Sequence, residues 1–380
     1  MATATPTSSL ELRSLVSADG VLELSLHEVP IPEPTATQVV VRVEAAPINP
    51  SDLGLLLAGA GVDAASFHGS PERPVVRIAL EERTMRALAG RVGKSLPAGN
   101  EGAGVVVAAG HDAAAQGLVG RSVAIAGGAM YAEYRVVETS QCLVLPDGMP
   151  PRTGASSFVN PMTTLGMIGT MRNEGHSALV HTAAASNLGQ MLVKLCQEED
   201  VKLVNIVRNP EHERMLAKLG AKHVCNSTSP TFMKDLIAAI SETGATIAFD
   251  AVGGGSLASQ ILTCMEAASS ASMADYSRYG STTHKQVYIY GGLDTSPTVL
   301  TRSFGFAWAI GGWLVSSFLQ GVSPGEFQAL RQRVVSGLES TFASTYTKDV
   351  SLAGALQPDA LAGYTKKATG EKYLVTPAGR

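Results

Sequence analysis

The pattern of hydrophobic and polar residues changes near residue 155 and divides the chain into two parts. Before that point, short apolar runs show a spacing close to two and are separated by Gly and Pro. The clearest runs cover residues 21–26, 39–43, 104–108 and 122–126. Such runs predict β-strands, and several short strands joined by turns favour a small barrel over a layered α/β sheet. Residues 80–94 differ, because charged side chains surround Met85, Leu88 and Val92 and predict an amphipathic helix.

After residue 155, short apolar runs alternate with segments of helical spacing. Strands are predicted at 178–181, 202–207, 222–225, 246–249 and 287–290. One intervening helix begins at Asn209-Pro210 and ends at Gly220, and another covers 232–241 and closes at Gly244. This alternation is typical of a doubly wound parallel sheet. We also expect a loop at 267–274, a helix at 324–338 and a last strand at 372–375.

Length, charge and cysteine content narrow the class of protein. A chain of 380 residues is longer than one compact core usually needs, so two domains are expected. The net charge is −4 and the Lys and Arg residues are scattered, which argues against a nucleic-acid partner. The most apolar stretch, 304–319, is shorter than the ~20 residues of a membrane span and contains glycines.

The four cysteines lie far apart, which predicts reduced thiols rather than a disulfide framework or a zinc knuckle. Residues 1–9 lack both a basic segment and an apolar core, so a cytoplasmic protein is expected.

The turn after the first strand of the second part is a candidate nucleotide site. Residues 183–189 (AAASNLG) open a helix, whose first backbone N–H groups favour a pyrophosphate. Only Gly189 remains of the G-x-G-x-x-G pattern, while the small residues Ala184 and Ser186 occupy the other two glycine positions. A nucleotide site and a plain packing turn both fit this pattern.

The end of the second strand bears on the choice of nucleotide. Arg208 stands where an acidic residue would bind the ribose 2′-hydroxyl of NADH. A guanidinium suits a 2′-phosphate, which favours NADPH. An exposed surface arginine is the alternative interpretation.

Eight motifs in order then give the chain a family resemblance. They are 47–53 (PINPSDL), 99–106 (GNEGAGVV), 130–134 (MYAEY), 160–164 (NPMTT), 219–224 (LGAKHV), 249–254 (FDAVGG), 290–292 (YGG) and 371–377 (EKYLVTP). The chain resembles the medium-chain dehydrogenase/reductase superfamily, and within it the zinc-free NADPH:quinone oxidoreductases. The resemblance implies an α/β protein with a GroES-like β-barrel catalytic domain (1–155 and 322–380) plus a Rossmann doubly wound parallel sheet that binds NADPH (156–321).

Zinc is not expected. The positions that carry the catalytic zinc ligands in the zinc alcohol dehydrogenases of this superfamily are Asn49, Asn100 and Asn160 here. Zinc is bound by thiolate, imidazole or carboxylate, and a neutral amide is a poor substitute.

The resemblance also implies a set of site residues. NADPH would lie in the cleft between the domains and pass hydride to a small-molecule quinone. The residues assigned to the cofactor are Asn160, Thr164, Ser186, Asn187, Leu188, Gly189, Arg208, Asn209, Val252, Gly253, Gly291, Gly292 and Leu293. Asn49 and Ser51 would donate hydrogen bonds to the substrate carbonyl, although Ser51 is also explained as a turn-capping serine. A homodimer is implied as well.

Two other functions stay open. In the related enoyl-thioester reductases a tyrosine donates the proton, and Ala60 stands at that position here, so an enoyl-thioester or enone reductase is the second choice. A non-catalytic NADPH-binding sensor or structural protein is the third. Segments 54–98 and 267–286 are long for the family and would shape a private substrate pocket, with Tyr276 and Tyr279 as candidates to contact a ring.

A hydrolase pattern is set aside. Residues 321–325 match G-x-S-x-G, but Ser323 is followed by Pro324 and Glu326, which predicts a capping box at a helix start. His181 ends a predicted buried strand and is interpreted as a structural histidine.

Overall fold

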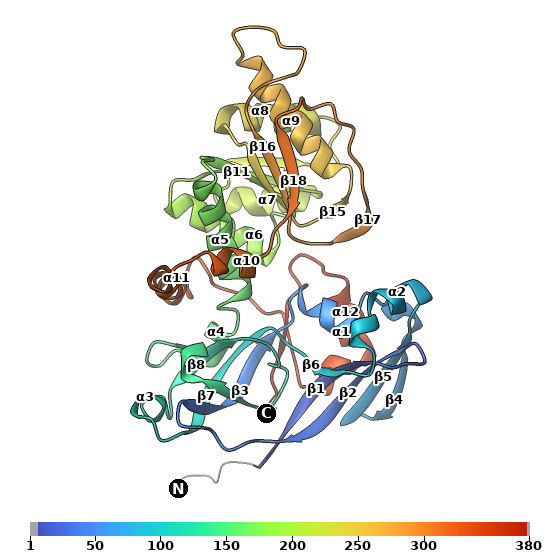
Figure 1. Ribbon diagram of the computed structural model, residues 1–380, viewed down its shortest axis with the longest axis vertical. Helices are drawn as coiled ribbons and strands as arrows, with labels where there is room; N and C mark the ends of the chain where they lie inside the picture. Colours follow the sequence, from blue (N-terminus) through green and yellow to red (C-terminus); the bar gives the residue numbers. More distant parts are fainter. Residues whose placement is uncertain (1–6, 378–380) are drawn as a thin grey trace. The chain divides into compact units, whose positions relative to one another are not determined.

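A computed structural model describes residues 7–377 of the chain (Figure 1). The chain divides into two units, one up to Val159 together with the residues from Arg333 onward, the other Asn160–Gln332. The expectation of a cytoplasmic protein was drawn from residues 1–9, of which positions 1–6 lie outside the described residues. Among the described residues, no helix has the length and apolar character to cross a membrane.

The first unit is built from two mainly antiparallel sheets. The first sheet has the order β4 (Ser66–Ser70), β5 (Arg73–Ala79), β2 (Val21–Pro30), β1 (Ser8–Val16) and β6 (Ser95–Pro97). The second has the order β10 (Cys142–Val144), β8 (Ser122–Ala126), β7 (Glu101–Ala109), β3 (Gln38–Pro47), β20 (Tyr373–Val375) and β19 (Lys348–Val350), with β9 (Tyr134–Glu138) also paired to β3. The predicted alternation holds where one face is buried, as in β2, whose Leu22 and Leu24 are fully buried.

Short helices connect these strands. They are α1 (Asp52–Leu57), α2 (Glu82–Ala87), α3 (Ala113–Gln116), α4 (Pro151–Gly154) and α12 (Pro358–Thr365). The single helix predicted at 80–94 was wrong in length, because α2 ends at Ala87 and a 3₁₀ turn, Ala89–Arg91, follows. Gly90 and Gly93 account for the early end, since glycine favours the helix poorly and Gly93 has a φ of +77°.

The second unit contains one parallel sheet of six strands. Its order is β13 (His223–Asn226), β12 (Lys202–Val207), β11 (Ala178–His181), β14 (Ile247–Asp250), β16 (Lys285–Ile289) and β18 (Trp308–Gly312). In chain order this is 3-2-1-4-5-6, the Rossmann arrangement, and the order reverses between β11 and β14. The predicted combination of an antiparallel unit with a doubly wound parallel sheet is confirmed.

The helices of this unit follow the predicted rhythm. They are α5 (Val159–Asn173), α6 (Asn187–Glu198), α7 (Pro210–Lys218), α8 (Phe232–Thr243), α9 (Leu257–Ala271) and α10 (Val315–Gln320). Asn209 caps α7 by accepting a hydrogen bond from the Glu211 backbone N–H (2.7 Å), with Pro210 in the first turn. Gly244 closes α8 in the left-handed conformation, as predicted.

A further small sheet pairs β15 (Gly253–Gly255) with β17 (Asp294–Thr298). The loop predicted at 267–274 was partly wrong, because α9 continues to Ala271. Ala268 packs against the hydrophobic core, and the Ser270 hydroxyl donates to the Glu266 carboxylate (2.6 Å), so these contacts extend the helix through a serine-rich segment.

Helix α11 (Pro324–Ser336) crosses the division between the units. The Ser323 backbone N–H and the Ser323 hydroxyl both donate to the Glu326 carboxylate (2.9 and 2.6 Å). The capping box is therefore confirmed at this helix start. The four cysteines all lie within the described residues, where they are buried and form no disulfide, as predicted.

Candidate active-site residues in the two units

The turn before α6 lies at the carboxyl end of β11, the first strand of the parallel sheet. Ser186 caps the helix, because its hydroxyl accepts a hydrogen bond from the Gly189 backbone N–H (3.1 Å). Ala183 has a φ of +49°, an unusual value for a residue with a side chain. Asn187 and Leu188 are partly exposed in the first turn of the helix. The turn therefore presents the start of α6 at the edge where Rossmann sheets bind ligands.

Gly189 is required by packing. A Cβ atom added there would lie 2.1 Å from the Ala184 carbonyl oxygen, closer than any real contact allows. Only glycine therefore lets α6 approach the turn this closely. The one glycine that remains of the dinucleotide pattern stands at the position where the backbone has no room for a side chain.

The predicted cofactor residues on the other strands also follow the carboxyl ends. Arg208 comes directly after β12 and is exposed, and within residues 7–377 it forms no ion pair. Val252 and Gly253 follow the end of β14 with only Ala251 between, and both donate a backbone hydrogen bond to Asp250 (2.9 and 3.1 Å).

Sequence reasoning missed the side chain that organises this edge. The fully buried carboxylate of Asp250 also accepts a hydrogen bond from the Thr182 hydroxyl (2.7 Å), whose oxygen accepts the Ala251 backbone N–H (2.8 Å). Asp250 thus joins the ends of β11 and β14, the two strands between which the order reverses. The sequence shows a polar residue, Thr182 or Asp250, at the end of each apolar run. It does not show that these two residues are hydrogen-bonded to each other.

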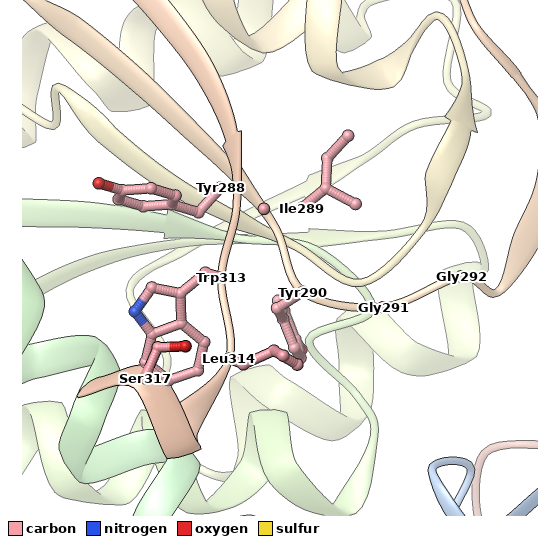
Figure 2. Close-up of a pocket in the computed structure, with 9 residues that line it drawn as sticks. Tyr288, Ile289, Tyr290, Gly291, Gly292, Trp313, Leu314 and Ser317 are labelled. Atoms are coloured by element: carbon pink, nitrogen blue, oxygen red, sulfur yellow. The ribbon is translucent and has the colours of Figure 1, made fainter. Parts of the chain in front are cut away.

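A cavity of about 670 Å³ opens beside the ends of β16 and β18. Figure 2 shows its wall, with the rings of Tyr288, Tyr290 and Trp313 and the side chain of Leu314 around it. Gly291 and Gly292, which the family resemblance assigns to the cofactor path, contribute backbone to the wall. Leu293, the next residue, is 43% exposed and does not line the cavity.

A buried histidine contacts Tyr290, one of the residues that line this cavity. His181 is fully buried, and its Nε2 lies 2.7 Å from the hydroxyl of Tyr290, with the two rings stacked at 5.9 Å. Burial lowers the pKa of His181 to about 3, so the imidazole is neutral. Burial likewise raises the pKa of Tyr290, which keeps the phenol protonated. The structural role of His181 was predicted from the sequence, whereas its hydrogen bond to Tyr290 was not.

Two predicted cofactor residues lie inside helix α5. Thr164 is fully buried and its hydroxyl donates to the Pro161 carbonyl (2.8 Å) within the same helix. Asn160 is 8% exposed at the start of the helix.

The long segment after α9 is anchored rather than loose. Lys285 is fully buried, and its ammonium donates to the Glu266 carboxylate (2.5 Å) and the Ser281 hydroxyl (3.0 Å). Glu266 also accepts the Ser281 backbone N–H (2.7 Å). Tyr276 and Tyr279 project outward at 93% and 57% exposure, and neither lines the cavity described above.

In the first unit, the predicted substrate residue Asn49 is buried. It is 2% exposed, and its side-chain amide donates to Glu101 Oε1 (2.8 Å). The other oxygen of Glu101 accepts the backbone N–H groups of Phe158 and Val159 (2.8 and 2.9 Å). Burial raises the pKa of Glu101. The carboxylate thus fixes the orientation of the Asn49 amide below the surface.

Asp52 forms the second buried connection. It is 1% exposed, its Oδ2 accepts the Asn49 backbone N–H and its Oδ1 accepts the Asn100 backbone N–H, both at 2.8 Å. Burial raises the pKa of Asp52 to about 7, although these two hydrogen bonds act in the opposite direction. One carboxylate therefore joins two segments that are far apart in the sequence.

Ser51 is the exposed member of this group. Its hydroxyl accepts a hydrogen bond from the Asn100 side-chain amide (3.1 Å). Ser51 stands at the start of α1, yet its side chain forms no capping hydrogen bond. The structure therefore removes the turn-capping explanation of this serine.

The donor chemistry here does not fit a zinc ion. Asn49 and Asn100 stand at two of the three positions that carry zinc ligands in the zinc alcohol dehydrogenases. Both side chains are neutral amides, and the Asn49 amide already donates to Glu101. Within residues 7–377, no set of three or more His, Cys, Asp or Glu side chains is arranged to hold a metal ion. No step of the chemistry below passes through zinc.

Comparison with known proteins shows a family match over part of the chain and a similar fold over nearly all of it. Residues 188–274 match the zinc-binding dehydrogenase family. The fold resembles that of a proposed NADPH:quinone reductase from Mesorhizobium loti, with 25% identity, a TM-score of 0.72, and coverage of 99% of this chain and 100% of that one. In this matched segment and in its fold, the chain resembles the medium-chain dehydrogenase/reductase superfamily.

Curated relatives match over part of their length. The mitochondrial enoyl-[acyl-carrier-protein] reductase of Caenorhabditis elegans is 27% identical over 226 residues, 57% of this chain and 57% of that protein. The synaptic vesicle membrane protein VAT-1 homologue of Rattus norvegicus is 31% identical over 160 residues, 41% of this chain and 39% of that protein. A mutant enoyl thioester reductase from Candida tropicalis shares the fold at 17% identity, with a TM-score of 0.67 and coverage of 98% and 100%.

Proposed function

We propose that this protein is a zinc-free, NADPH-dependent reductase that transfers hydride to a quinone or a similar electron-poor small molecule. The observation that carries the proposal is the turn at the carboxyl end of β11. Ser186 caps α6 there, and Gly189 leaves no space for a side chain against Ala184. Such a turn at the reversal point of a Rossmann sheet suits a pyrophosphate.

Particular residues fit the parts of NADPH. The turn at Ser186–Gly189 would hold the pyrophosphate through backbone N–H groups, and the exposed guanidinium of Arg208 would hold the 2′-phosphate. Val252, Gly253, Gly291 and Gly292 would line the rest of the dinucleotide path. When bound, NADPH supplies the hydride, and the protein positions the acceptor.

The acceptor would be held by the first unit. Ser51 is the exposed hydroxyl there, and we assign it the hydrogen bond to the acceptor carbonyl. Asn49 was predicted to donate as well, but its burial beneath Glu101 favours a supporting role. Hydrogen bonds that strengthen as charge develops on the carbonyl oxygen lower the barrier to hydride transfer.

A reductase of enoyl thioesters or enones is the second candidate, because the relatives from Caenorhabditis elegans and Candida tropicalis carry such names. Ala60 at the expected tyrosine position speaks against it. A non-catalytic NADPH-binding protein is the third candidate, since no strong acid or base stands among the predicted substrate residues. By family resemblance we further propose a cytoplasmic homodimer, which light scattering of the purified chain would test.

The first experiment follows the absorbance of NADPH over time with a small quinone and with crotonyl-CoA, each repeated with NADH. Quinone turnover that favours NADPH would support the proposal. Turnover with crotonyl-CoA alone would favour the enoyl-thioester reductase. Tight NADPH binding without turnover would contradict both and favour the sensor.

A further inference from the structure

The hydrogen bond between Asn100 and Ser51 has a direction with chemical consequences. The Asn100 Nδ2 group donates and the Ser51 Oγ accepts, at 3.1 Å. An amide nitrogen has no acceptor capacity, so the serine oxygen must accept and its own proton stays free. Ser51 is exposed and Asn100 is partly exposed. The pair therefore offers a polarised O–H and a second amide N–H on one stretch of surface.

The backbone of Asn100 is held rigidly beneath this pair. Its N–H donates to Asp52 Oδ1 (2.8 Å), and its carbonyl accepts the backbone N–H groups of Gly127 and Gly128 (both 3.3 Å). The other oxygen of Asp52 accepts the Asn49 N–H (2.8 Å), two residues before Ser51. Both oxygens of one buried carboxylate thus set the spacing of the two segments that carry the pair.

We propose that Ser51 and Asn100 form a donor pair for the oxyanion of a carbonyl-containing acceptor, and that Asp52 is the positioning residue that holds the pair together. The proposal rests on the proposed reductase function, because that reaction develops such an oxyanion. Asn100 was noted in the sequence only as a replaced zinc ligand. Here we assign it a role of its own, through the hydrogen bond that its side-chain amide donates to Ser51.

The electron balance of the reaction shows what the pair would do. The hydride would leave a C–H bond of NADPH, which is oxidised to NADP⁺, and would form a C–H bond at a conjugated carbon of the acceptor, while the π electrons move to the carbonyl oxygen. That oxygen becomes an enolate or phenolate and later takes a proton from water. The Ser51 O–H would donate to it, and the Asn100 N–H would stabilise the extra negative charge that this places on Oγ.

Asn49 is less suited to this task. Its Nδ2 already donates to Glu101, and the side chain is 2% exposed. It lies on the protein side of the pair, where it links Glu101 to the Asp52 connection. We therefore place Asn49 among the positioning residues.

The test uses a stable oxyanion, 4-nitrophenolate, at a pH where this probe is ionised. Its absorption spectrum shifts when it accepts hydrogen bonds, and titration with the full chain plus NADP⁺ measures its dissociation constant. The variants are Ser51→Ala, Asn100→Ala, the double variant, and Asp52→Asn. Ser70→Ala is the matched control, because Ser70 is an exposed serine on the β4–β5 hairpin.

We expect each single alanine variant to weaken probe binding about tenfold, and the double variant to be hardly weaker than either, because residues acting as a unit are not additive. Asp52→Asn should weaken it similarly, since an amide cannot accept at both of its ends. If Asp52→Asn fails to fold by circular dichroism, the Ser51–Asn100 cycle still decides. The control should bind like the wild type.

Two results would overturn the donor pair. One is a wild type that does not bind the probe, and the other is an Asn100→Ala variant that binds it as the wild type does. Quinone turnover, measured on the same samples, reports separately on the proposed function. If the wild type turns over quinone and Asn100→Ala binds the probe as the wild type does, the donor pair alone is contradicted. If probe binding depends on the pair but no quinone turnover is seen, the reductase assignment alone is contradicted.

Discussion

His181 at the end of β11 and Tyr290 after the end of β16 are hydrogen-bonded at 2.7 Å, although β14 lies between their strands in the sheet. The histidine is fully buried and its Nδ1 has no hydrogen-bond partner within the described part of the chain. The tyrosine is its one polar contact there, and it also lines the cavity shown in Figure 2. One residue of the cavity wall is thus hydrogen-bonded to a buried, uncharged histidine.

The first prediction concerns stability in mild acid. The pKa of His181 falls from 6.5 to about 3 on folding, because burial disfavours the imidazolium. The unfolded chain then binds the proton more readily, so this stability is complete above the unfolded value and is lost as the pH falls toward the folded value. Between pH 6.5 and about pH 5, wild type should lose about 2 kcal/mol more than His181→Gln. Urea unfolding of both proteins at these two pH values measures it, and equal losses would contradict it.

The second prediction concerns the choice of cofactor. Arg208→Ala should weaken NADPH binding about tenfold or more, because a phosphate loses its charge-assisted partner, and should leave NADH binding nearly unchanged. Isothermal titration of both nucleotides measures the two constants. Lys218→Ala, an exposed cation in the last turn of α7, is the control and should change neither. An equal loss for NADPH and NADH would show that Arg208 does not contact the 2′-phosphate.

The third prediction concerns the turn before α6. Gly189→Ala forces a methyl group against the Ala184 carbonyl and should cost about 1–3 kcal/mol of unfolding free energy, together with most of the NADPH affinity. Gly321→Ala is the matched control, because its Cβ would meet nothing closer than 3.5 Å. Thermal unfolding and NADPH titration are the measurements. Wild-type stability and wild-type NADPH affinity in Gly189→Ala would contradict the prediction and show that the turn can accommodate a methyl group.

The fourth prediction concerns the pH dependence of the rate of acceptor reduction. Burial first, with the charge of Glu101 in the same direction, raises the pKa of Asp52 to about 7. As the pH falls through that value, the carboxyl takes a proton and one oxygen no longer accepts its backbone N–H. Reductase kcat with a quinone should therefore fall below about pH 7, while Asp52→Asn should be slower and show no step there. Glu101, Tyr131 and Lys372 also act on this site, so a step that persists in Asp52→Asn would assign the titration to one of them.

The sequence predicted much of the fold because local patterns report local structure. The strand at Ser122–Ala126, the Asn209-Pro210 helix start and the Gly244 helix end were all recognisable from residue type and spacing. Helix α9 was cut short in the prediction because its last turns are rich in serine, and packing against the core outweighed that weak preference.

For the candidate site, too, some features follow from the sequence and others only from the tertiary structure. The sequence by itself determined which residue types stand at the key positions: amides in place of zinc ligands, Arg208 after the second strand, and Gly189 in the turn. Only the tertiary structure decided that Asn49 is buried beneath Glu101, that Asp52 joins Asn49 to Asn100, and that Tyr290 meets His181. The Asn49–Glu101, Asp52–Asn100 and His181–Tyr290 contacts join residues 52, 48 and 109 positions apart. No local pattern encodes them, because burial and hydrogen-bond partners arise only when distant segments pack together.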